Sequence, residues 1–327
     1  MPCARSGNAC WLASSPSAVN LMELAFAGTP AFAATILGGL IASDHEVGLV
    51  ISQPDRRRGR GRKPLKSPVA KLALATNLPL LRPARIGEVA KEIATHDALV
   101  VAAYGQILRP DTLYATPSGA WNVHASLLPA YRGAAPIERA IMDGEKETGV
   151  SIMRMDEGLD TGPIALQRRT PIPPEMTGGE LTQTLADLGT EAIIEVMYSL
   201  EENSITLNEQ DNLHATYAAK IEDEERVIRW GEEVGKVHDL VRALTPHIGA
   251  RTFHPEIVGP VKVLRSRIFQ ENFHHLEPGT ILPAKERILV ACGEGILRIM
   301  ELQIPGGRVL SADDFLRGRP LSGAFSS

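Results

Sequence analysis

Apolar and polar positions in the first half of the chain alternate between strand-like and helix-like patterns. Short apolar runs at residues 24–27 and 47–52 predict strands, and a helical pattern over residues 31–43 lies between them. A third run, at residues 97–103, is almost wholly apolar, which is typical of a central parallel strand that is buried on both faces. The order predicts an α/β fold, with a Rossmann-like, mostly parallel sheet and helices on both faces.

The alternation continues to about residue 200. Further strands are predicted at residues 121–124, 149–155 and 164–168, and a short helix at residues 136–142. Thr177 and Glu180 have the spacing of a capping box, in which the hydroxyl and the carboxylate satisfy two free backbone amides at a helix start. A long helix that ends near residue 200 is therefore expected.

The second half of the chain has a different pattern. A polar, aperiodic stretch at residues 201–212 predicts a linker, and we place a domain boundary near residue 207. One amphipathic segment follows at residues 234–244. Short strands punctuated by glycine and proline are then predicted at residues 261–269, 280–282, 288–291 and 296–302. We expect an α/β catalytic domain over residues 22–207 and a small β barrel over residues 208–327.

Composition supports two folded domains. The length of 327 residues exceeds what one compact core comfortably serves. The chain is 44% hydrophobic and 22% charged, an ordinary globular composition that excludes a wholly disordered chain. Its formal net charge of -5 gives no general attraction to nucleic acid, so contact with a polyanion needs a local basic patch. Three cysteines are too few for a disulfide framework in a chain of this size.

Residues 1–21 form a polar leader that is rich in serine and alanine and has no periodic pattern. The leader lacks the unbroken apolar run of a secretory signal, and no stretch approaches the roughly 18 to 20 apolar residues of a membrane span. We therefore expect a cytoplasmic protein without membrane contact. We expect the leader to be unstructured or to reflect a mis-assigned start codon, because an apolar strand begins just after Met22.

The densest chemical signal is Asn122-Val-His124, a predicted strand that runs into a loop ending at Pro136. Strand alternation places Asn122 and His124 on the same side. Open α/β sheets bind ligands in loops at the carboxyl ends of their parallel strands. A second signal is the acidic, glycine-rich turn from Asp156 to Asp160, which follows a neighbouring strand. Because these strands are expected to share one sheet, Asp160 should lie close to His124.

These residues alone leave other interpretations open. A histidine near a strand end is often only a hydrogen-bonded structural residue, and Asp160-Thr-Gly162 is often only a turn. The same tripeptide suggests an aspartic protease, but one copy lacks the second carboxylate that a shared-proton pair needs. The nine histidines and three cysteines show no cluster with metal-ligand spacing, so no metal is expected.

Several stretches resemble the methionyl-tRNA formyltransferase family in sequence, order and spacing. They are Ala27-Gly-Thr-Pro30, Gln53-Pro-Asp55 with its following Gly-Arg-Gly loop, Val101-Ala-Ala-Tyr104-Gly105, Asn122-Val-His124 through Arg132-Gly-Ala-Ala-Pro136, Gly149-Val-Ser-Ile-Met153, Gly158-Leu-Asp160-Thr-Gly162, Arg242-Ala-Leu-Thr-Pro246 and Gly293-Glu-Gly295-Ile-Leu297. The Asn-x-His and Leu-Asp-Thr-Gly pair is shared by a wider set of folate-dependent formyltransferases. The resemblance extends from about residue 24 to residue 318, and it implies an OB-like barrel as the second domain.

The resemblance implies formyl transfer from 10-formyltetrahydrofolate to the α-amine of methionine on initiator methionyl-tRNA. This reaction serves translation initiation, and we expect the protein to be a monomer. An amine that attacks a formyl carbon builds negative charge on the formyl oxygen, which the Asn122 amide and a protonated His124 would stabilise. Asp160 would hold that imidazole charged. Directly or through a water, Asp160 would also accept the proton that the attacking ammonium loses.

The resemblance further implies a folate pocket in which backbone groups contact the pterin. Its expected residues are Tyr104, Gly105, Gln106, Ile107, Leu108, Ser126, Leu127, Leu128, Pro129, Asp156 and Gly158. Without the resemblance, residues 101–108 read as a buried strand with its exit turn, and both interpretations can hold together.

A basic loop follows Asp55 and carries seven positive side chains between residues 56 and 66. Such a run cannot pack in a core, so by itself it indicates a solvated loop. The loop resembles an insertion found in the family, which contacts phosphates and unpaired bases at the tRNA acceptor end. The residues implied in tRNA binding are Arg56, Arg57, Arg58, Arg60, Arg62 and Lys63 in this loop, with Arg60 at the family's important position, and Lys262 beside Arg265 and Arg267 in the second domain.

Three other functions remain as alternatives. The catalytic residues would equally serve formyl transfer to a small amine, such as a glycinamide nucleotide or an amino sugar, although the barrel argues against it. The strand-turn-helix start suggests a nicotinamide-dependent oxidoreductase, but Gly28-Thr-Pro-Ala-Phe32 lacks the G-x-G-x-x-G fingerprint. A non-catalytic RNA-binding module would use the basic loop and leave Asn122, His124 and Asp160 without a role.

Overall fold

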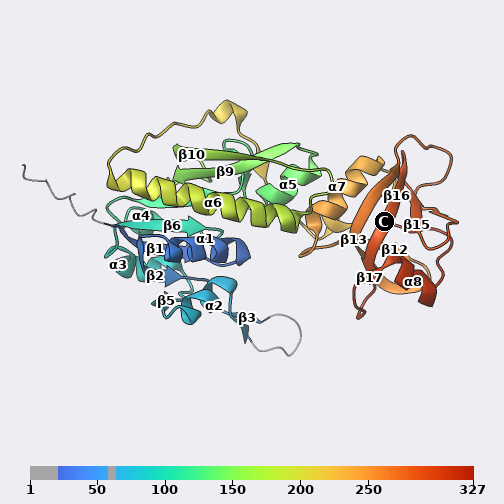
Figure 1. The fold of residues 1–327 in the computed structure, drawn as a ribbon, viewed down its shortest axis with the longest axis horizontal. Coiled ribbons are helices and arrows are strands. Elements are labelled where there is room, and N and C mark those ends of the chain that lie inside the picture. The colour runs from blue at the N-terminus through green and yellow to red at the C-terminus, as the bar shows by residue number, and fades with distance from the viewer. Residues whose placement is uncertain (1–20, 58–63) are drawn as a thin grey trace, which may run out of the picture.

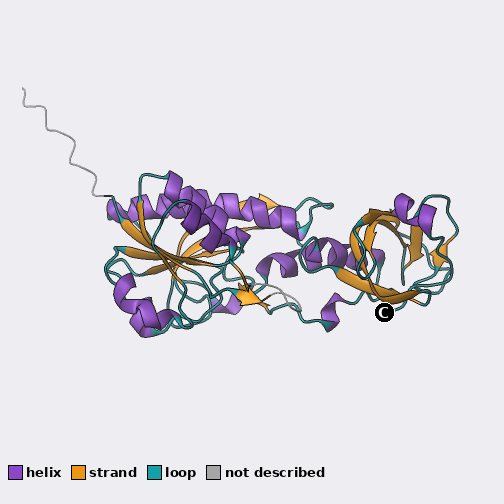
Figure 2. Ribbon diagram, turned by 90° about the horizontal axis from the view of Figure 1, so that it is seen from below, coloured by secondary structure: helices purple, strands orange, loops and turns teal. Residues whose placement is uncertain are grey.

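The computed structural model describes residues 21–57 and 64–327, which form a larger α/β part and a smaller β barrel (Figures 1 and 2). Residues 1–20 of the predicted leader lie outside the described residues, as do Arg58, Arg60, Arg62 and Lys63 of the basic loop. Within the described ranges, no helix combines the length and the apolar character needed to cross a membrane.

A seven-stranded sheet forms the centre of the larger part. Its strands are β1 (Glu23–Gly28), β2 (Glu46–Ile51), β5 (Leu80–Leu81), β6 (Ala98–Ala102), β7 (Ala120–His124), β9 (Glu147–Arg154) and β10 (Ile164–Pro171). They are arranged in the order β10-β9-β7-β6-β1-β2-β5. All neighbours from β7 to β5 run parallel, whereas β9 is antiparallel to β7 and β10 is antiparallel to β9. The prediction of a mostly parallel sheet is confirmed.

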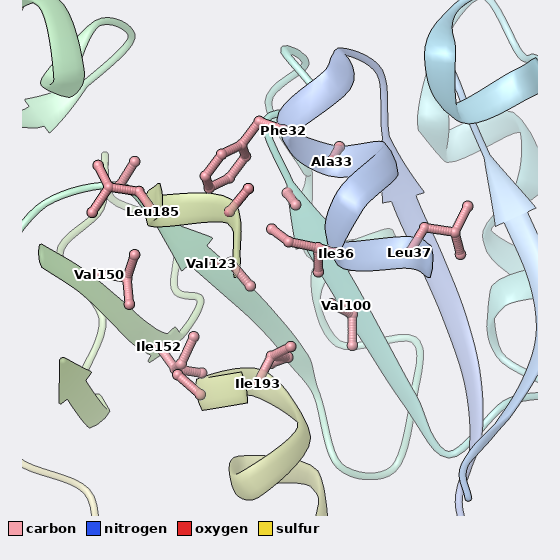
Figure 3. Close-up of a cluster of buried hydrophobic side chains, with 14 of the residues drawn as sticks. Phe32, Ala33, Ile36, Leu37, Val100, Val123, Val150, Ile152, Leu185 and Ile193 are labelled. Atoms are coloured by element: carbon pink, nitrogen blue, oxygen red, sulfur yellow. The ribbon is translucent and has the colours of Figure 1, made fainter. Parts of the chain in front are cut away.

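Helices cover both faces of this sheet. They are α1 (Ala31–Ala42), α2 (Pro68–Ala75), η1 (Ile86–Val89), α3 (Ala90–Ile93), α4 (Pro110–Leu113), α5 (Pro136–Met142) and α6 (Gly178–Glu201). Alternate residues of β1 enter two separate cores, with Leu24 and Phe26 on one face and Ala25 and Ala27 on the other. The first core packs under α1, α2, α5 and α6, and Figure 3 shows side chains of α1 and α6 meeting those of β6, β7 and β9. The second core packs under η1, α3 and α4.

The start of α6 confirms the predicted capping box. Thr177 Oγ1 accepts a hydrogen bond from the Glu180 amide at 3.3 Å, and Glu180 Oε2 accepts one from the Thr177 amide at 2.8 Å. The bond from the Thr177 amide lowers the pKa of Glu180, with a smaller effect of the Thr177 hydroxyl, which donates to the same carboxylate oxygen at 2.8 Å. The capped helix then crosses the whole sheet (Figure 1).

The smaller part is an antiparallel barrel. Its strands are β12 (Ala250–His254), β13 (Ile257–Gln270), β14 (Ile281–Leu282), β15 (Ile288–Ala291), β16 (Ile296–Gln303) and β17 (Leu310–Ser311), and its helices are α7 (Val234–Leu244) and α8 (Ala312–Gly318). The order is β12-β13-β16-β15-β14, with β17 beside β16. The chain end bridges the two outer strands, because Ser326 pairs with Phe253 of β12 and Ala324 pairs with Thr280 next to β14. The predicted barrel is confirmed.

The segment that was predicted as a linker lies against the larger part. After α6 the chain returns along β10 (Figure 1), where Asn208 and Ile164 exchange backbone hydrogen bonds of 2.9 and 2.8 Å. It continues through η2 (Asn212–His214), β11 (Tyr217–Ala218) and η3 (Glu224–Arg226), and β11 pairs in parallel with β8 (Arg132–Gly133). The domain boundary near residue 207 stays a prediction. Elsewhere, β3 (Arg56–Arg57) pairs with β4 (Pro64–Leu65) on either side of residues 58–63.

Candidate active site

Asn122, His124 and Asp160 meet on one face of β7. Asn122 Nδ2 lies 3.4 Å from Asp160 Oδ1, and His124 Nδ1 lies 3.7 Å from Asp160 Oδ2. Val123 packs into the first core, which leaves its two neighbours on the opposite face. His124 is buried and Asn122 is half-buried, while the Asp160 side chain keeps 14% of its surface exposed. The carboxylate therefore stays in reach of solvent.

The loop between β9 and β10 brings Asp160 to this face. Because β9 is antiparallel to β7, its last residue, Arg154, pairs with Trp121, at the far end of β7 from His124. The loop must therefore fold back along β7 to bring Asp160 close to Asn122 and His124. A hydrogen bond of 2.9 Å from the Arg154 amide to the Pro163 carbonyl closes its neck. The expected closeness of Asp160 and His124 is present, but it comes from this fold-back and not from strand adjacency alone.

The same loop is braced internally. Asp156 Oδ1 accepts hydrogen bonds from the Gly158 amide at 3.0 Å and from Thr161 Oγ1 at 2.7 Å. Asp160 has a φ of 53°, in the left-handed region that Asp adopts more readily than most residues. A Cβ at position 162 would lie 1.9 Å from the Arg154 carbonyl oxygen, so only glycine fits there. Asp156 and Gly158 thus shape the loop, and their contact with folate stays a prediction.

Backbone groups of the loop after β7 hold the charged pair. Asp160 Oδ2 accepts a hydrogen bond from the Gly133 amide at 2.8 Å, and His124 Nε2 lies 2.9 Å from the Tyr131 carbonyl oxygen. Both ring nitrogens of His124 therefore face oxygens that accept hydrogen bonds, and an imidazolium donates at both positions. For His124 to donate to a formyl oxygen, one of its ring nitrogens must first turn away from the oxygen that it faces here.

The loop after β6 is fixed by two stretches that matched the family. The Tyr104 carbonyl accepts hydrogen bonds from Gln53 Nε2 at 2.7 Å and from Thr29 Oγ1 at 3.2 Å. Gln106 anchors the other side of the loop, because its Oε1 accepts from the Ile86 amide at 2.9 Å. The stretches around Thr29 and Gln53 thus act by holding the predicted folate loop.

Within this loop, the predicted folate residues differ in exposure. Tyr104 and Leu108 are buried in the second core, whereas Ile107 is 89% exposed. The Tyr104 hydroxyl has no hydrogen-bond partner in the part of the chain that the structure describes. Burial, with a smaller effect of Glu88, raises the pKa of Tyr104 to about 12. Gly105 has a φ of 81°, which glycine adopts without strain. A ligand at this loop would meet its backbone and Ile107 rather than the Tyr104 ring.

The predicted folate residues 126–129 follow β7 directly. Ser126 is buried, and its Oγ donates to the Ala130 carbonyl at 2.6 Å. The Leu128 amide donates to Ser151 Oγ at 3.0 Å, and the Leu128-Pro129 peptide bond is cis. Leu127 is half-buried. A cavity of about 390 Å³ lies against Leu128 and Pro129, but the catalytic residues do not line it. A cavity of about 690 Å³ lies elsewhere, in the barrel beside residues 281–288.

Two further residues at the site, Gln210 and Arg132, were not among the site residues predicted from the sequence. Gln210 Nε2 donates to the Asp160 carbonyl at 2.9 Å and to the Gly162 carbonyl at 2.7 Å. Its Oε1 accepts from Arg132 Nε at 3.1 Å and from Arg132 Nη2 at 2.8 Å. Gln210 stands in a polar, aperiodic stretch, and no pattern there distinguishes it. Arg132 belongs to the matched motif, but only the structure shows that it is buried.

The predicted tRNA-binding residues are distributed over two places. Arg56 and Arg57 form β3, and Lys262 lies on β13. Val261, Val263 and Ser266 of β13 are buried, so the half-buried Lys262 and the exposed Arg265 and Arg267 face outward. Their contact with tRNA stays a prediction. Among the described residues, no group of three or more His, Cys, Asp and Glu side chains gathers as metal ligands do.

Comparison with known proteins finds matches over most of the chain. The formyl transferase family matches residues 22–197, and the formyl transferase C-terminal domain matches residues 220–320. The methionyl-tRNA formyltransferase of Rubrobacter xylanophilus is 61% identical over 304 residues, which cover 93% of this chain and 99% of the relative. That of Carboxydothermus hydrogenoformans is 45% identical over 309 residues, which cover 92% and 98%.

A solved structure shares the fold. The N-formyltransferase of Helicobacter canadensis, in complex with folinic acid and dTDP-3-aminofucose, superposes with a TM-score of 0.64 at 18% identity, over 85% of this chain and 99% of that chain. Both parts of the molecule and nearly its full length are thus matched, and the chain belongs to the formyl transferase family.

Proposed function

We propose that this chain transfers the formyl group of 10-formyltetrahydrofolate to the α-amino group of methionine on initiator methionyl-tRNA. Relatives with this name are 61% and 45% identical over more than nine-tenths of the chain, and they include the barrel as well as the sheet. The observation that carries the proposal is the meeting of an amide, an imidazole and a carboxylate, with Asp160 within 3.7 Å of both Asn122 and His124. We place the reaction in the cytoplasm, at translation initiation, and expect a monomer.

The folate, when bound, supplies the formyl carbon. The Asn122 amide makes only a long hydrogen bond of 3.4 Å to Asp160, so its Nδ2 is available to donate to the formyl oxygen as negative charge develops there. Asp160 is held by the Gly133 amide at 2.8 Å and is partly exposed, as a group that accepts the proton of the attacking ammonium must be. His124 Nδ1 lies 3.7 Å from the same carboxylate, and a protonated His124 would help to stabilise the formyl oxygen once one ring nitrogen turns towards it.

The folate contacts belong to the same proposal. Two loops follow the carboxyl ends of adjacent parallel strands, β6 and β7, where ligands of open α/β sheets bind. One presents backbone groups and the exposed Ile107, and the other presents Pro129 beside a cavity. A flat ring with polar edges and apolar faces fits such a surface. Contacts with tRNA are assigned to the arginines of the basic loop and to Lys262.

A direct test offers the purified chain 10-formyltetrahydrofolate with one of three acceptors: charged initiator tRNA, charged elongator tRNA, or small amines such as a glycinamide nucleotide and an amino-sugar nucleotide. We expect the highest kcat/KM with initiator methionyl-tRNA. Preferred formylation of a small amine would reject the proposal in favour of the alternative reaction. If the folded protein formylates none of these acceptors, both the proposal and the small-amine alternative are rejected.

A further inference from the structure

We propose that Gln210 is a positioning residue for Asp160. It lies in residues 208–218, here called the strap, which follow α6 and pack on both catalytic loops. The activity part of this inference rests on the proposed function. Gln210 reaches the site from a segment 50 residues away in sequence from Asp160.

The Gln210 amide group fixes the backbone on either side of Thr161. Its Nε2 donates one hydrogen bond to the Asp160 carbonyl at 2.9 Å and another to the Gly162 carbonyl at 2.7 Å. A side-chain amide has two N–H hydrogens, so it satisfies both carbonyls at once. A carboxylate of the same shape has no hydrogen to donate and would repel them. This geometry sets the peptide orientation at Asp160, whose φ of 53° is not the usual one for a residue with a side chain.

Arg132 determines which way the Gln210 amide points. Arg132 is 2% exposed, and its guanidinium donates through Nε at 3.1 Å and Nη2 at 2.8 Å to Gln210 Oε1. Because a guanidinium only donates, the amide oxygen must face Arg132 and the amide nitrogen must face the loop. Asn212 Oδ1 accepts a third bond, at 2.8 Å. No carboxylate in residues 21–57 or 64–327 lies within ion-pair distance of Arg132, so these amides satisfy a buried charge.

The strap also holds the second catalytic loop. The Tyr131 amide donates to Thr216 Oγ1 at 2.8 Å, and the Arg132 amide donates to the Thr216 carbonyl at 2.9 Å. On the other side of the same three residues, the Tyr131 carbonyl faces His124 and the Gly133 amide donates to Asp160. A Cβ at Gly133 would lie 2.9 Å from the Ala218 carbonyl oxygen, so the strap packs closely against this loop. The strap therefore positions both the Tyr131 carbonyl, which faces His124, and the Gly133 amide, which donates to Asp160.

Three substitutions separate positioning from structural support. Gln210→Glu keeps an oxygen for Arg132 and adds an opposite charge, but it removes both donors to the loop. We expect a loss in kcat of about 10- to 100-fold with initiator methionyl-tRNA, as for a small displacement of a catalytic group. The KM for 10-formyltetrahydrofolate and the unfolding temperature should stay near those of the parent. Gln210→Ala should lose kcat and also stability. Asn212→Ala, the matched control, removes an Arg132 partner and leaves both loop bonds, so its kcat should stay within about twofold of the parent.

Hydrogen exchange of the free protein gives a readout that does not depend on the reaction. The Gly133 amide is protected by its bond to Asp160, so residues 131–135 should exchange faster in Gln210→Glu than in the parent or in Asn212→Ala. Parent-like kcat and exchange in Gln210→Glu would overturn the inference. Equal losses in Asn212→Ala would also overturn it, because the strap would then serve only to neutralise Arg132. If the parent formylates no tRNA, the proposed function fails, and the exchange rates still decide the role of Gln210.

Discussion

At the scale of single residues, Asp160 carries both a chemical and a conformational requirement. Its carboxylate faces Asn122, His124 and the Gly133 amide, and its backbone is left-handed. Asparagine tolerates that backbone and keeps an oxygen that accepts from Gly133, whereas alanine does neither. Two substitutions at this one position therefore separate charge from backbone strain.

We expect Asp160→Asn to lower kcat by about 10²- to 10⁴-fold, the range for loss of a general base, with an unfolding temperature close to that of the parent. Asp160→Ala should lose at least as much activity and, in addition, about 1–2 kcal/mol of stability from the left-handed backbone. Single-turnover formylation and thermal unfolding measure the two effects. A near-normal rate for Asp160→Asn would remove Asp160 from the proposed mechanism.

At the scale of elements, the loop between β9 and β10 has a closely packed neck. A Cβ at position 162 would lie 1.9 Å from the Arg154 carbonyl oxygen, which is backbone and cannot rotate away. We expect Gly162→Ala to open the neck and to lower kcat by about 100-fold, through displacement of Asp160 by about 1 Å.

The matched control for this change is Gly231→Ala, since nothing lies within 4 Å of a Cβ there. Its activity and stability should equal those of the parent. Kinetics on the two variants, with circular dichroism to verify folding, tests the prediction. A fully active Gly162→Ala would show that the loop does not set the position of Asp160.

The connection between η3 and α5 has a predictable dependence on pH. Arg139 donates two hydrogen bonds to Glu225, at 2.6 and 2.9 Å, and these, with a smaller effect of the Glu222 amide, lower the pKa of Glu225 to about 2. Because the folded-state pKa lies below the ordinary value of 4.5, the pair stabilises the fold above pH 4.5 and loses this contribution as the pH falls towards 2.

Glu225→Gln is therefore expected to lower the free energy of unfolding at pH 7, but by no more than about 1 kcal/mol because the pair is partly exposed. The difference from the parent should shrink between pH 4.5 and the acid limit of the folded state. Urea unfolding at a series of pH values measures it. A difference that stays constant with pH would mean that the Glu225 charge contributes nothing.

The elements also show what the sequence alone could predict. The buried strand β15 has the bounds expected from its apolar run, and the capped start of α6 lies at Thr177. β12 was missed because two of its inward residues, Thr252 and His254, are polar and hide the alternation. Their partners are remote, since Trp230 Nε1 donates to Thr252 Oγ1 at 2.9 Å and the Ser322 carbonyl lies 2.9 Å from His254 Nε2. The strap escaped prediction for the same reason, because its contacts are polar and long-range.

At the scale of the whole molecule, close backbone contacts join the sheet and the barrel. The Gly179 amide donates to the Thr245 carbonyl at 2.9 Å, and a Cβ at Gly178 would lie 2.2 Å from the Ala243 carbonyl oxygen. α7 contacts α5 and α6 of the larger part as well as β13 of the barrel. The outer face of β13 is therefore joined through α7 to two helices of the larger part.

The last prediction concerns the charges on the outer face of β13. The chain has a formal net charge of -5, so attraction to tRNA must come from local groups such as Lys262 and Arg265. If each contacts a phosphate, Lys262→Ala and Arg265→Ala should each weaken tRNA binding and reduce the slope of log Kd against log salt by about one unit. The KM for 10-formyltetrahydrofolate should not change. Lys285→Ala, an exposed lysine after β14 in the same barrel, is the matched control and should leave the slope intact. An unaltered slope in the two β13 variants, or an equal change in the control, would show that tRNA does not bind across this face.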